Sequence, residues 1–427
     1  MKQMDYNEAT EYILSIPRFA AKTHLDNTRA ILSKLGNPEN KFKSIHVAGT
    51  NGKGSVCKML ALALEEQGYK VGLFTSPHLM NMNERISING IDISDEDFTD
   101  IFNRVKSDID ELLDSDKEVA HPAFFEYVFL MAALYFAEQN CDYVVLETGL
   151  GGRLDATSVV TPEVCIITSI GMDHMQYLGN TIEEIAGEKA GIIVPGVPVI
   201  YNTGSYVADK VIEEKAGKLV SPAYNVVKYK DGVLKLLGEE STAGFKALYQ
   251  IDNAVTATLA FMMMQENDEL DVTDMKKALA KFKWPGRMQY LAPNIIMDGA
   301  HNEDAIKRFV ESVKSIAERD GWKKMSLLFA VSSDKDYEDI ISILTRELTF
   351  EDIYVGELAS DRKLDASKVV ELFQKYSPAE KHFSIVGTKN IEDAWRLATG
   401  ELEEDTLLLI VGSLYMVGEI EKLIGKE

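Results

Sequence analysis

The chain has 427 residues, of which 46% are hydrophobic and 26% charged, a composition typical of a globular protein with roughly two or three domains. Its formal net charge of −23 at pH 7 argues against general binding to nucleic acid or to an anionic membrane, because both need a basic surface. We therefore expect neither as a partner, and we expect any anionic ligand to be held by a few local cations.

The sequence predicts neither export nor membrane insertion. Residues 1–11 are polar and acidic, unlike a signal peptide. The most apolar stretch, residues 123–137, is interrupted by Glu126 and is too short to span a bilayer. Cys57, Cys141 and Cys165 stand singly in apolar runs, without the spacing of a metal site or a disulfide framework. We expect a cytoplasmic protein with buried thiols.

The first part of the chain alternates short β-branched runs with amphipathic helical patterns. A helix is predicted over residues 6–15, and a strand over residues 44–48 leads into a glycine-rich loop. Further strands are predicted at residues 70–75, 143–146, 164–168 and 197–200, and helices at residues 56–67, 95–113 and 124–138. Strands separated by helices predict a mostly parallel sheet that is covered on both faces.

Residues 223–238 have a different pattern. Two apolar runs, residues 224–230 and 233–237, flank the dipeptide Asp231-Gly232, which is typical of a tight turn between two strands. We therefore expect a β-hairpin that adds a small antiparallel patch to the first domain.

The segment Trp284-Pro285-Gly286-Arg287 interrupts a helical pattern and marks the approach to a joint between domains. The alternation then restarts, with strands predicted at residues 295–297, 325–331, 352–355, 382–386 and 406–411, and helices at residues 303–318, 337–346, 366–374, 391–402 and 413–424. We expect an α/β protein with a phosphate-loop nucleotide-binding domain over residues 1–292. A smaller Rossmann-like α/β domain follows over residues 293–427.

The glycine-rich loop after the first strand is the strongest local signal. It consists of Gly49, Thr50, Asn51, Gly52, Lys53, Gly54 and Ser55. A strand, a glycine loop with a lysine and a helix form the arrangement that wraps backbone N–H groups around phosphates. Gly54 separates Lys53 from Ser55, which departs from the common phosphate-loop pattern. The alternative is an ordinary tight turn between a strand and a helix.

Polar residues follow the next strands at the same expected edge of the sheet, where open α/β sheets bind ligands. Ser76, His78 and Arg85 lie after residues 70–75 and can supply a metal ligand and an anion clamp, although a plain surface loop is the simpler alternative. Glu147 ends the strand over residues 143–146, and a carboxylate beside a phosphate loop suits Mg²⁺.

His174 follows the strand after that. A lone histidine is more often structural, but its position at the same edge as Glu147 favours a site residue, with a second ion as one option because imidazole is an unusual ligand for Mg²⁺. Spacing alone makes Lys189 a surface lysine on a short helix. In the second domain, the loop from Asp298 to Asn302, which includes His301, can close over a nucleotide or simply cap a helix.

With these residues in view, the chain resembles folylpolyglutamate synthase and dihydrofolate synthase, within the Mur ligase family. The resemblance covers nearly the whole length and keeps the order of the motifs. These are residues 35–38, the glycine loop, residues 75–79 with 84–86, 147–157, 173–174 with 178–179, 189–192, 285–287, 298–302, 334–336 and 412–415.

The resemblance implies an ATP-binding Mur-ligase-type domain followed by a glutamate-ligase domain. It implies an enzyme that uses ATP and Mg²⁺ to add L-glutamate to a folate or dihydropteroate, and a protein that is a monomer. By resemblance, Ser76, Glu147 and His174 fall on Mg²⁺ ligands, and Lys189 falls on a lysine that carries a CO₂-derived carbamate, a further metal ligand. Lys53, Lys189 and His174 are then the catalytic residues.

By the same resemblance, nucleotide contacts are expected from the glycine loop and from Asn253, Arg287, Asp298 and His301. Substrate contacts are expected from Ser76, His78, Arg85, Arg153 and Asp173.

Three departures from the family pattern stand out. His24-Leu25-Asp26-Asn27 replaces a Gly-Leu-x-Arg pattern, which leaves the choice among folate substrates open. Tyr249 stands where a histidine is usual, and Ser158 where an asparagine is usual. None of these departures falls on an expected metal ligand.

The implied reaction forms an acyl phosphate from a substrate carboxylate and ATP, and the amine of L-glutamate then displaces phosphate. One alternative is another Mur-type ligase that joins an amino acid to a cell-wall precursor. A second, from a different class, is a non-catalytic nucleotide-switch protein, which would bind ATP without substrate-stimulated hydrolysis.

Overall fold

The computed structural model describes residues 3–18, 25–242, 244–264, 272–360, 362–378 and 381–425. The chain forms two compact units. Unit 1 comprises Met1–Gly244 and Asp252–Phe282, and unit 2 comprises Phe245–Ile251 and Lys283–Glu427. Unit 2 thus includes residues 245–251 and 283–292, which lie before the boundary expected at 292/293, and residues 289–292 form a strand that pairs within the second sheet.

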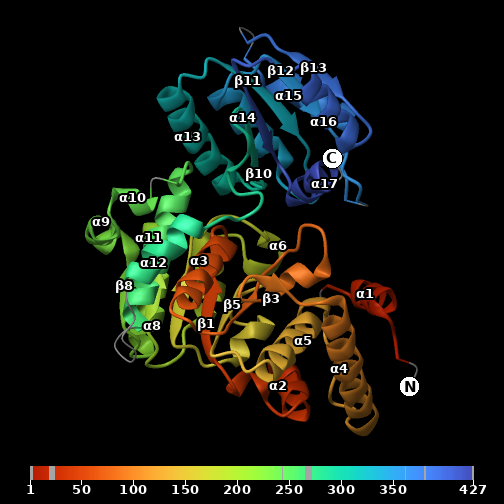
Figure 1. Cartoon of the computed structure of the whole chain (residues 1–427), viewed down its shortest axis with the longest axis vertical. Coiled ribbons are helices and arrows are strands. Elements are labelled where there is room, and N and C mark those ends of the chain that lie inside the picture. The colour runs from red at the N-terminus through yellow and green to blue at the C-terminus, as the bar shows by residue number, and fades with distance from the viewer. Residues whose placement is uncertain are drawn as a thin grey trace. The chain divides into compact units, whose positions relative to one another are not determined.

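Within the described residues, unit 1 contains an eight-stranded sheet with the order β4-β3-β2-β5-β1-β6-β7-β8 (Figure 1). All pairs are parallel except β2 with β3 and β3 with β4. The strands are β1 (Lys43–Ala48), β2 (Val71–Phe74), β3 (Ile86–Ile88), β4 (Ile91–Asp92), β5 (Tyr143–Glu147), β6 (Val164–Ile167), β7 (Val199–Tyr201) and β8 (Ala223–Asn225). The central position of β1 puts the glycine loop between the ends of β5 and β6.

The helices of the first part of the chain follow the predicted alternation. Helix α3 lies against β1, β2 and β5 and packs against α12. The helices are α1 (Tyr6–Ser15), α2 (Leu25–Lys34), α3 (Lys53–Glu66), α4 (Asp95–Ser115), α5 (Phe124–Glu138), α6 (Met175–Leu178), α7 (Ile182–Lys189), α8 (Tyr206–Lys218), α9 (Val226–Leu237), α10 (Glu239–Thr242), α11 (Leu248–Met264) and α12 (Val272–Lys281). Short 3₁₀ turns occupy Pro38–Asn40, Met82–Arg85, Ala156–Val159 and Ala190–Ile192.

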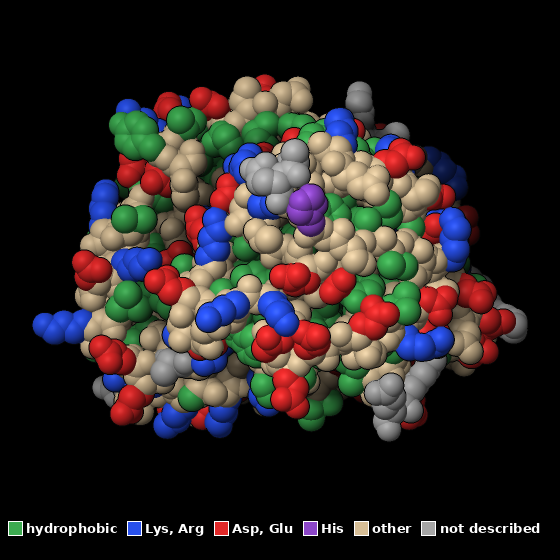
Figure 2. All heavy atoms as spheres, turned by 90° about the horizontal axis from the view of Figure 1, so that it is seen from above, with side chains coloured by type: hydrophobic (Ala, Val, Ile, Leu, Met, Phe, Trp, Pro, Cys, Tyr) green, Lys and Arg blue, Asp and Glu red, His purple; other side chains and the backbone are tan. Residues whose placement is uncertain are grey.

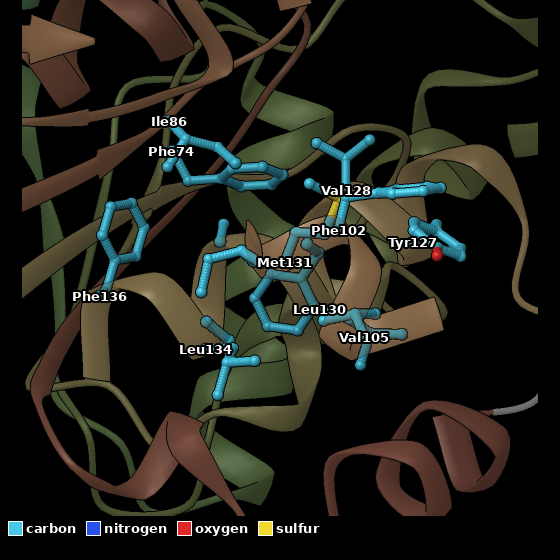
Figure 3. Close-up of a cluster of buried hydrophobic side chains, with 14 of the residues drawn as sticks. Phe74, Ile86, Phe102, Val105, Tyr127, Val128, Leu130, Met131, Leu134 and Phe136 are labelled. Carbon is cyan, nitrogen blue, oxygen red and sulfur yellow. The ribbon is translucent and has the colours of Figure 1, made fainter. Parts of the chain in front are cut away.

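The largest core of unit 1 surrounds α5, whose side chains are buried on almost every side. This explains why residues 123–137 are so apolar without being a membrane segment. The close-up in Figure 3 shows side chains from several elements meeting there, namely Phe74 of β2, Ile86 of β3, Phe102 and Val105 of α4, and Tyr127, Val128, Leu130, Met131, Leu134 and Phe136 of α5.

The expected β-hairpin at residues 223–238 is wrong. Only Ala223–Asn225 forms a strand, and it pairs parallel to β7. Residues 226–237 form helix α9 instead, capped by the Asn225 side chain, which accepts a hydrogen bond from the Val227 N–H. Buried Val226, Val233 and Leu237 are seven and four residues apart, which is the spacing of one helix face. The Asp-Gly pair therefore lies within a helix.

Unit 2 contains a six-stranded sheet with the order β13-β12-β11-β14-β10-β9, in which only β9 and β10 pair antiparallel. Its strands are β9 (Gln289–Ala292), β10 (Ile295–Asp298), β11 (Lys324–Phe329), β12 (Asp352–Val355), β13 (Ser384–Gly387) and β14 (Thr406–Val411). Its helices are α13 (Glu303–Asp320), α14 (Tyr337–Glu347), α15 (Ala366–Tyr376), α16 (Ile391–Gly400) and α17 (Leu414–Ile424). Two α/β units with mostly parallel sheets confirm the predicted fold class.

The surface is consistent with the acidic composition. On the face shown in Figure 2, lysine and arginine side chains are interspersed with aspartate and glutamate rather than gathered into a continuous basic area. Across the described ranges of the chain, none of the helices combines the length and apolarity needed to cross a membrane.

Candidate active site

The glycine loop turns sharply between β1 and α3, with Gly52 as the residue before the helix. Gly49 and Gly52 have φ values of +150° and +90°, a region that favours glycine. A Cβ atom on Gly49 would lie 1.8 Å from the Thr168 Oγ1 atom, and one on Gly52 would lie 2.6 Å from the Asn253 Oδ1 atom. Both positions therefore require glycine, and the side chain of Asn253 of α11 lies beside the loop.

The segment after β6 holds the other side of the loop. The Thr50 N–H donates to the Ser169 carbonyl at 2.6 Å, and the Gly171 N–H donates to the Thr50 Oγ1 atom at 3.1 Å. The Asn51 N–H donates to the Ser169 hydroxyl at 3.2 Å. The loop is thus fixed before any ligand arrives, with the N-terminus of α3, the positive end of the helix dipole, beside it.

Two lysines converge on one carbonyl of this loop. The Lys53 Nζ atom donates to the Gly49 carbonyl at 3.1 Å, and the Lys189 Nζ atom donates to the same carbonyl at 2.7 Å. The Lys53 Nζ atom also lies 3.9 Å from the Glu147 Oε1 atom. One carboxylate and two amines are therefore gathered at the end of β1, which is suited to binding an anion.

Lys189 is buried, with only 4% of its surface exposed, so the prediction of a surface lysine from spacing alone is wrong. It ends α7 and faces the glycine loop rather than solvent. Burial, together with the nearby Lys53 cation, lowers the pKa of Lys189 to about 7 against the opposing effect of Asp173 and Asp155. Near neutral pH a large share of this amine is therefore uncharged and nucleophilic.

Glu147 is the carboxylate of the site and is 4% exposed. Its Oε2 atom accepts a hydrogen bond of 3.0 Å from the Ser76 N–H, which brings the loop after β2 to the end of β5. Among the described residues, no group of three or more His, Cys, Asp or Glu side chains could hold a metal. Any metal at this edge would need ligands of other kinds besides Glu147.

Asp173 and His174 follow the segment that holds the glycine loop. His174 has a left-handed backbone, with φ of 52°, and directly precedes α6. Its N–H donates to the Asp173 Oδ1 atom at 2.9 Å, and its ring Nε2 atom lies 3.9 Å from the same oxygen. The ring is 43% exposed, so it is open to solvent at this edge of the sheet.

His78 and Arg85 contact each other. The Arg85 Nε atom donates to the His78 Nδ1 atom at 2.8 Å, so His78 carries its ring proton on Nε2 when neutral. Arg85 is buried and lies over the Phe124 ring at 5.2 Å. Arg153 contacts α7, where its guanidinium donates to the Glu188 Oε1 atom at 2.9 Å. Both arginines thus make contacts within the protein, in addition to the substrate contacts expected from the resemblance.

The remaining predicted residues belong to unit 2. Asp298 ends β10 and is buried, which raises the pKa of its carboxyl, while the Arg287 cation opposes that shift. Its Oδ2 atom accepts hydrogen bonds from the Tyr249 hydroxyl and from the Met288 N–H, the latter at 2.8 Å. The His301 Nδ1 atom lies 2.7 Å from the Gly299 carbonyl. The segment that contains Arg287 therefore lies beside the end of β10, where Asp298 and His301 are.

Asn302 acts as the helix cap that the simpler alternative proposed, since its Oδ1 atom accepts a hydrogen bond from the Ala305 N–H at the start of α13. His24, the first residue of the segment that departs from the family pattern, lies outside the described residues.

Comparison with known proteins identifies the family. The pattern of the Mur ligase middle domain matches residues 108–260, and that of the Mur ligase glutamate ligase domain matches residues 286–414. The chain is 35% identical to the dihydrofolate synthase/folylpolyglutamate synthase of Bacillus subtilis, over 98% of each chain. The chain belongs to the dihydrofolate synthase/folylpolyglutamate synthase family, within the Mur ligases. It is therefore an ATP-dependent ligase, as the resemblance implied.

Solved structures of folylpolyglutamate synthases agree with this fold. The enzyme of Thermotoga maritima is 32% identical, with a TM-score of 0.80 over 98% of this chain and 96% of that one. The Mycobacterium tuberculosis enzyme complexed with ADP is 25% identical, with a TM-score of 0.85 over 99% of this chain and 98% of that one.

Two polar residues that organise the site were not identified as site residues from the sequence. Glu84 accepts three backbone hydrogen bonds, from the N–H groups of residues 79, 80 and 81, and so shapes the loop after Ser76. Asp155 accepts hydrogen bonds from the loop that follows Glu147. Both have a local sequence signal, since Asp155 is the helix cap two residues before Thr157, and Glu84 is the acidic residue three positions after Asn81 in a capping box.

Proposed function

We propose that this chain uses ATP to join L-glutamate to the carboxylate of a folate or of dihydropteroate through an acyl phosphate. The observation that carries this proposal is the convergence of Lys53, Lys189 and Glu147 on the end of β1. That arrangement occurs in a chain whose full-length relatives are named dihydrofolate synthase and folylpolyglutamate synthase. The Mycobacterium tuberculosis relative is described as complexed with ADP, which supports a nucleotide at the same fold position.

In the first step, the glycine loop amides and the Lys53 ammonium hold the phosphates of ATP and stabilise the charge that develops on them. A substrate carboxylate oxygen attacks the γ-phosphorus, the bond to the β-phosphate oxygen breaks, and ADP leaves. In the second step, the amine of L-glutamate attacks the acyl carbon, loses a proton to the medium, and inorganic phosphate departs. Loss of water from the site protects the acyl phosphate from hydrolysis.

Mg²⁺ would be held by Glu147 with Ser76 and His174, as the family pattern implies. The donor chemistry of Glu147 fits, since its carboxylate is a hard oxygen ligand that is buried beside the amide of Ser76. A Mg²⁺ ion bound there offsets negative charge on the phosphates. Lys189 as an ammonium would repel such an ion, so Lys189 can act as a metal ligand only after its positive charge is replaced by a negative one.

A carbamate on Lys189 supplies that reversal. Its pKa near 7, set first by burial, leaves a neutral amine that can attack the carbon of CO₂. An N–C bond forms, the amine nitrogen loses a proton to the medium, and the product is an anionic carbamate. The change replaces a buried cation next to Lys53 with an anion that can bind both Lys53 and a metal.

The test is folate-dependent release of ADP by the purified chain with dihydropteroate or tetrahydrofolate, each supplied separately with L-glutamate. Glu147→Gln should abolish this release, whereas Glu214→Gln, which changes an exposed carboxylate on α8, should not. Product mass identifies the accepted substrate. Wild-type turnover by Glu147→Gln would remove Glu147 from the site.

The same assay separates the alternatives. ATP binding without any substrate-stimulated ADP release would favour a nucleotide switch. Stimulation only by a cell-wall precursor and an amino acid would favour a different Mur-type ligase. The expected cytoplasmic location and monomeric state remain predictions, and size-exclusion chromatography with light scattering measures the latter.

A further inference from the structure

A buried chain of hydrogen bonds lies behind the site in unit 1. It begins at His46, in the middle of β1, whose Nε2 atom lies 2.8 Å from the Thr157 Oγ1 atom. Thr157 then contacts Asp155, with 2.5 Å between the Thr157 Oγ1 atom and the Asp155 Oδ1 atom. His46 is 1% exposed, Thr157 is fully buried and Asp155 is 5% exposed. None of these three side chains is required by the reaction described above.

The direction of these hydrogen bonds follows from counting protons. The Thr157 hydroxyl has a single proton, and it donates that proton to Asp155. The Thr157 oxygen must therefore accept from His46, which fixes the histidine as the tautomer with a proton on Nε2. Burial lowers the pKa of His46 to about 3, so the ring stays neutral and the direction is constant at neutral pH.

Asp155 transmits this orientation to the loop after β5. Its Oδ2 atom accepts from the Gly149 N–H at 2.8 Å and from the Leu150 N–H at 2.9 Å, while its Oδ1 atom also accepts from the Thr157 N–H at 3.1 Å. With four donors its carboxylate is well satisfied despite its burial. The loop that leads from Glu147 toward Gly152 is thus held at the amides of Gly149 and Leu150.

The same loop supports Lys189 from behind. A Cβ atom on Gly152 would lie 2.8 Å from the Lys189 carbonyl and 2.9 Å from the Glu188 carbonyl, so the loop backbone runs directly against the end of α7. The Arg153 N–H donates to the Glu188 carbonyl at 2.8 Å. A shift of the loop must therefore move the end of α7, where Lys189 is attached.

These contacts form a path that begins on β1 and ends at Gly49, the residue that directly follows this strand. His46 lies on β1, and the path leads through Thr157, Asp155 and the loop to Lys189. The Lys189 amine then donates to the carbonyl of Gly49, three residues after His46. We propose that His46 and Thr157 are positioning residues that fix the Lys189 amine at the glycine loop. This inference rests on the proposed role of Lys189 in the reaction.

Thr157→Val tests the path because valine has nearly the shape of threonine but lacks the hydroxyl. It should lower kcat by about 10²-fold, in line with the cost of small displacements in active sites, with little change in the KM for ATP. Thr157→Ser keeps the hydroxyl and should restore most of kcat. Thr258→Val is the matched control, because Thr258 is equally buried in α11 and donates only to the Ala254 carbonyl.

A second variant and a second readout keep the test decisive. His46→Phe breaks the same path at its other end and should reproduce the effect of Thr157→Val on kcat. In both variants, the pKa of Lys189, measured by NMR of ¹⁵N-labelled lysine, should move from about 7 toward its usual value. This second measurement needs no substrate, so it tests the positioning even if the wild-type chain shows no folate-dependent ADP release and the proposed function fails.

Two results would overturn the inference. One is an unchanged kcat and an unchanged pKa of Lys189 in Thr157→Val. The other is an equal loss of kcat in Thr258→Val, which would mean that lowered stability rather than lost orientation causes the effect.

Discussion

Lys189 offers a quantitative test, because its surroundings make it costly to keep protonated. Burial and the neighbouring Lys53 lower the pKa of this amine from 10.5 to about 7. In the folded chain the proton is lost near pH 7, while in the unfolded chain it is lost near pH 10.5. The unfolded chain therefore binds more protons throughout this window, and the free energy of unfolding should rise as the pH is raised through it.

The magnitude follows from the two pKa values. The difference between 10.5 and about 7, at about 1.36 kcal/mol per pKa unit, gives roughly 5 kcal/mol at most. The unfavourable contribution is fully present below pH 7 and is lost by pH 10.5. Lys189→Met, which removes the buried amine but keeps much of its volume, should therefore be more stable than the wild type at pH 7. The Gly49 carbonyl keeps a donor in this variant, since the Lys53 Nζ atom lies 3.1 Å away.

The assay is urea denaturation of both proteins between pH 7 and pH 10 in buffer freed of CO₂, which keeps the amine unmodified. The difference in unfolding free energy should be largest at pH 7 and shrink as the pH rises. Lys218→Met is the control, because that lysine on α8 is exposed and solvent screens its pairing with Glu214. A Lys189→Met protein that is less stable at pH 7, or a difference that does not depend on pH, would refute the reasoning.

The same lowered pKa has a consequence for reactivity. At pH 7 about half of the Lys189 amine is neutral, whereas a lysine of pKa 10.5 would be neutral in about one molecule in 3,000. Lys189→Met should therefore lose folate-dependent ADP release while it gains stability. Incubation of the wild type with ¹³C-bicarbonate should give a carbamate signal in NMR that Lys189→Met lacks.

Two further predictions concern backbone fit and buried charge. Gly152→Ala should lower stability by about 1–3 kcal/mol and reduce ADP release, because its Cβ atom would lie 2.8 Å from the Lys189 carbonyl. Gly187→Ala, in open space on α7, should instead be neutral or stabilising by up to about 1 kcal/mol; urea denaturation compares the two. Tyr249→Phe should destabilise unit 2 by about 1–3 kcal/mol, because buried Asp298 loses a donor. Tryptophan fluorescence follows that loss, since all three tryptophans lie in unit 2.

Most strands and helices could be predicted because their signals are local. Buried parallel strands such as β14 are continuous β-branched or aliphatic runs, and the helices between the strands have apolar faces with helical spacing. The hairpin prediction failed because Asp231-Gly232 is typical of a tight turn, but this dipeptide does not determine whether the residues on either side form strands or a helix. Val226, Val233 and Leu237 gave the competing helical spacing, and tertiary burial of that face decided the outcome.

The site residues at strand ends could be predicted for the same reason, since parallel strands end at one edge of a sheet. Glu147 and Val47 are paired in register, so the carboxylate necessarily lies beside the glycine loop. Lys189 could not be predicted from spacing, because its burial depends on the close approach of Gly152 and Gly191 to neighbouring backbone. Such contacts join segments far apart in sequence, and only the fold reveals them.

Tyr249 departs from the family pattern implied by the resemblance but still supplies a hydrogen-bond donor. The resemblance leads us to expect a histidine at this position, whereas here the Tyr249 hydroxyl donates to the buried Asp298 carboxylate. Burial raises the pKa of Tyr249, so the hydroxyl keeps its proton and remains a donor. A protonated hydroxyl and an imidazole N–H can both satisfy a carboxylate, so the substitution preserves the hydrogen bond while it removes a group that titrates near neutral pH.

The charges at the glycine loop suggest an order of events at the site. Burial and the Lys53 cation favour the neutral, reactive amine of Lys189 over its ammonium form, and the Asp173 and Asp155 carboxylates only partly offset this. A phosphate chain bound at the loop reverses this preference, because a nearby anion raises the pKa of a lysine. The amine is therefore most reactive toward CO₂ before the nucleotide binds, and ADP added alone should slow the appearance of the ¹³C carbamate signal.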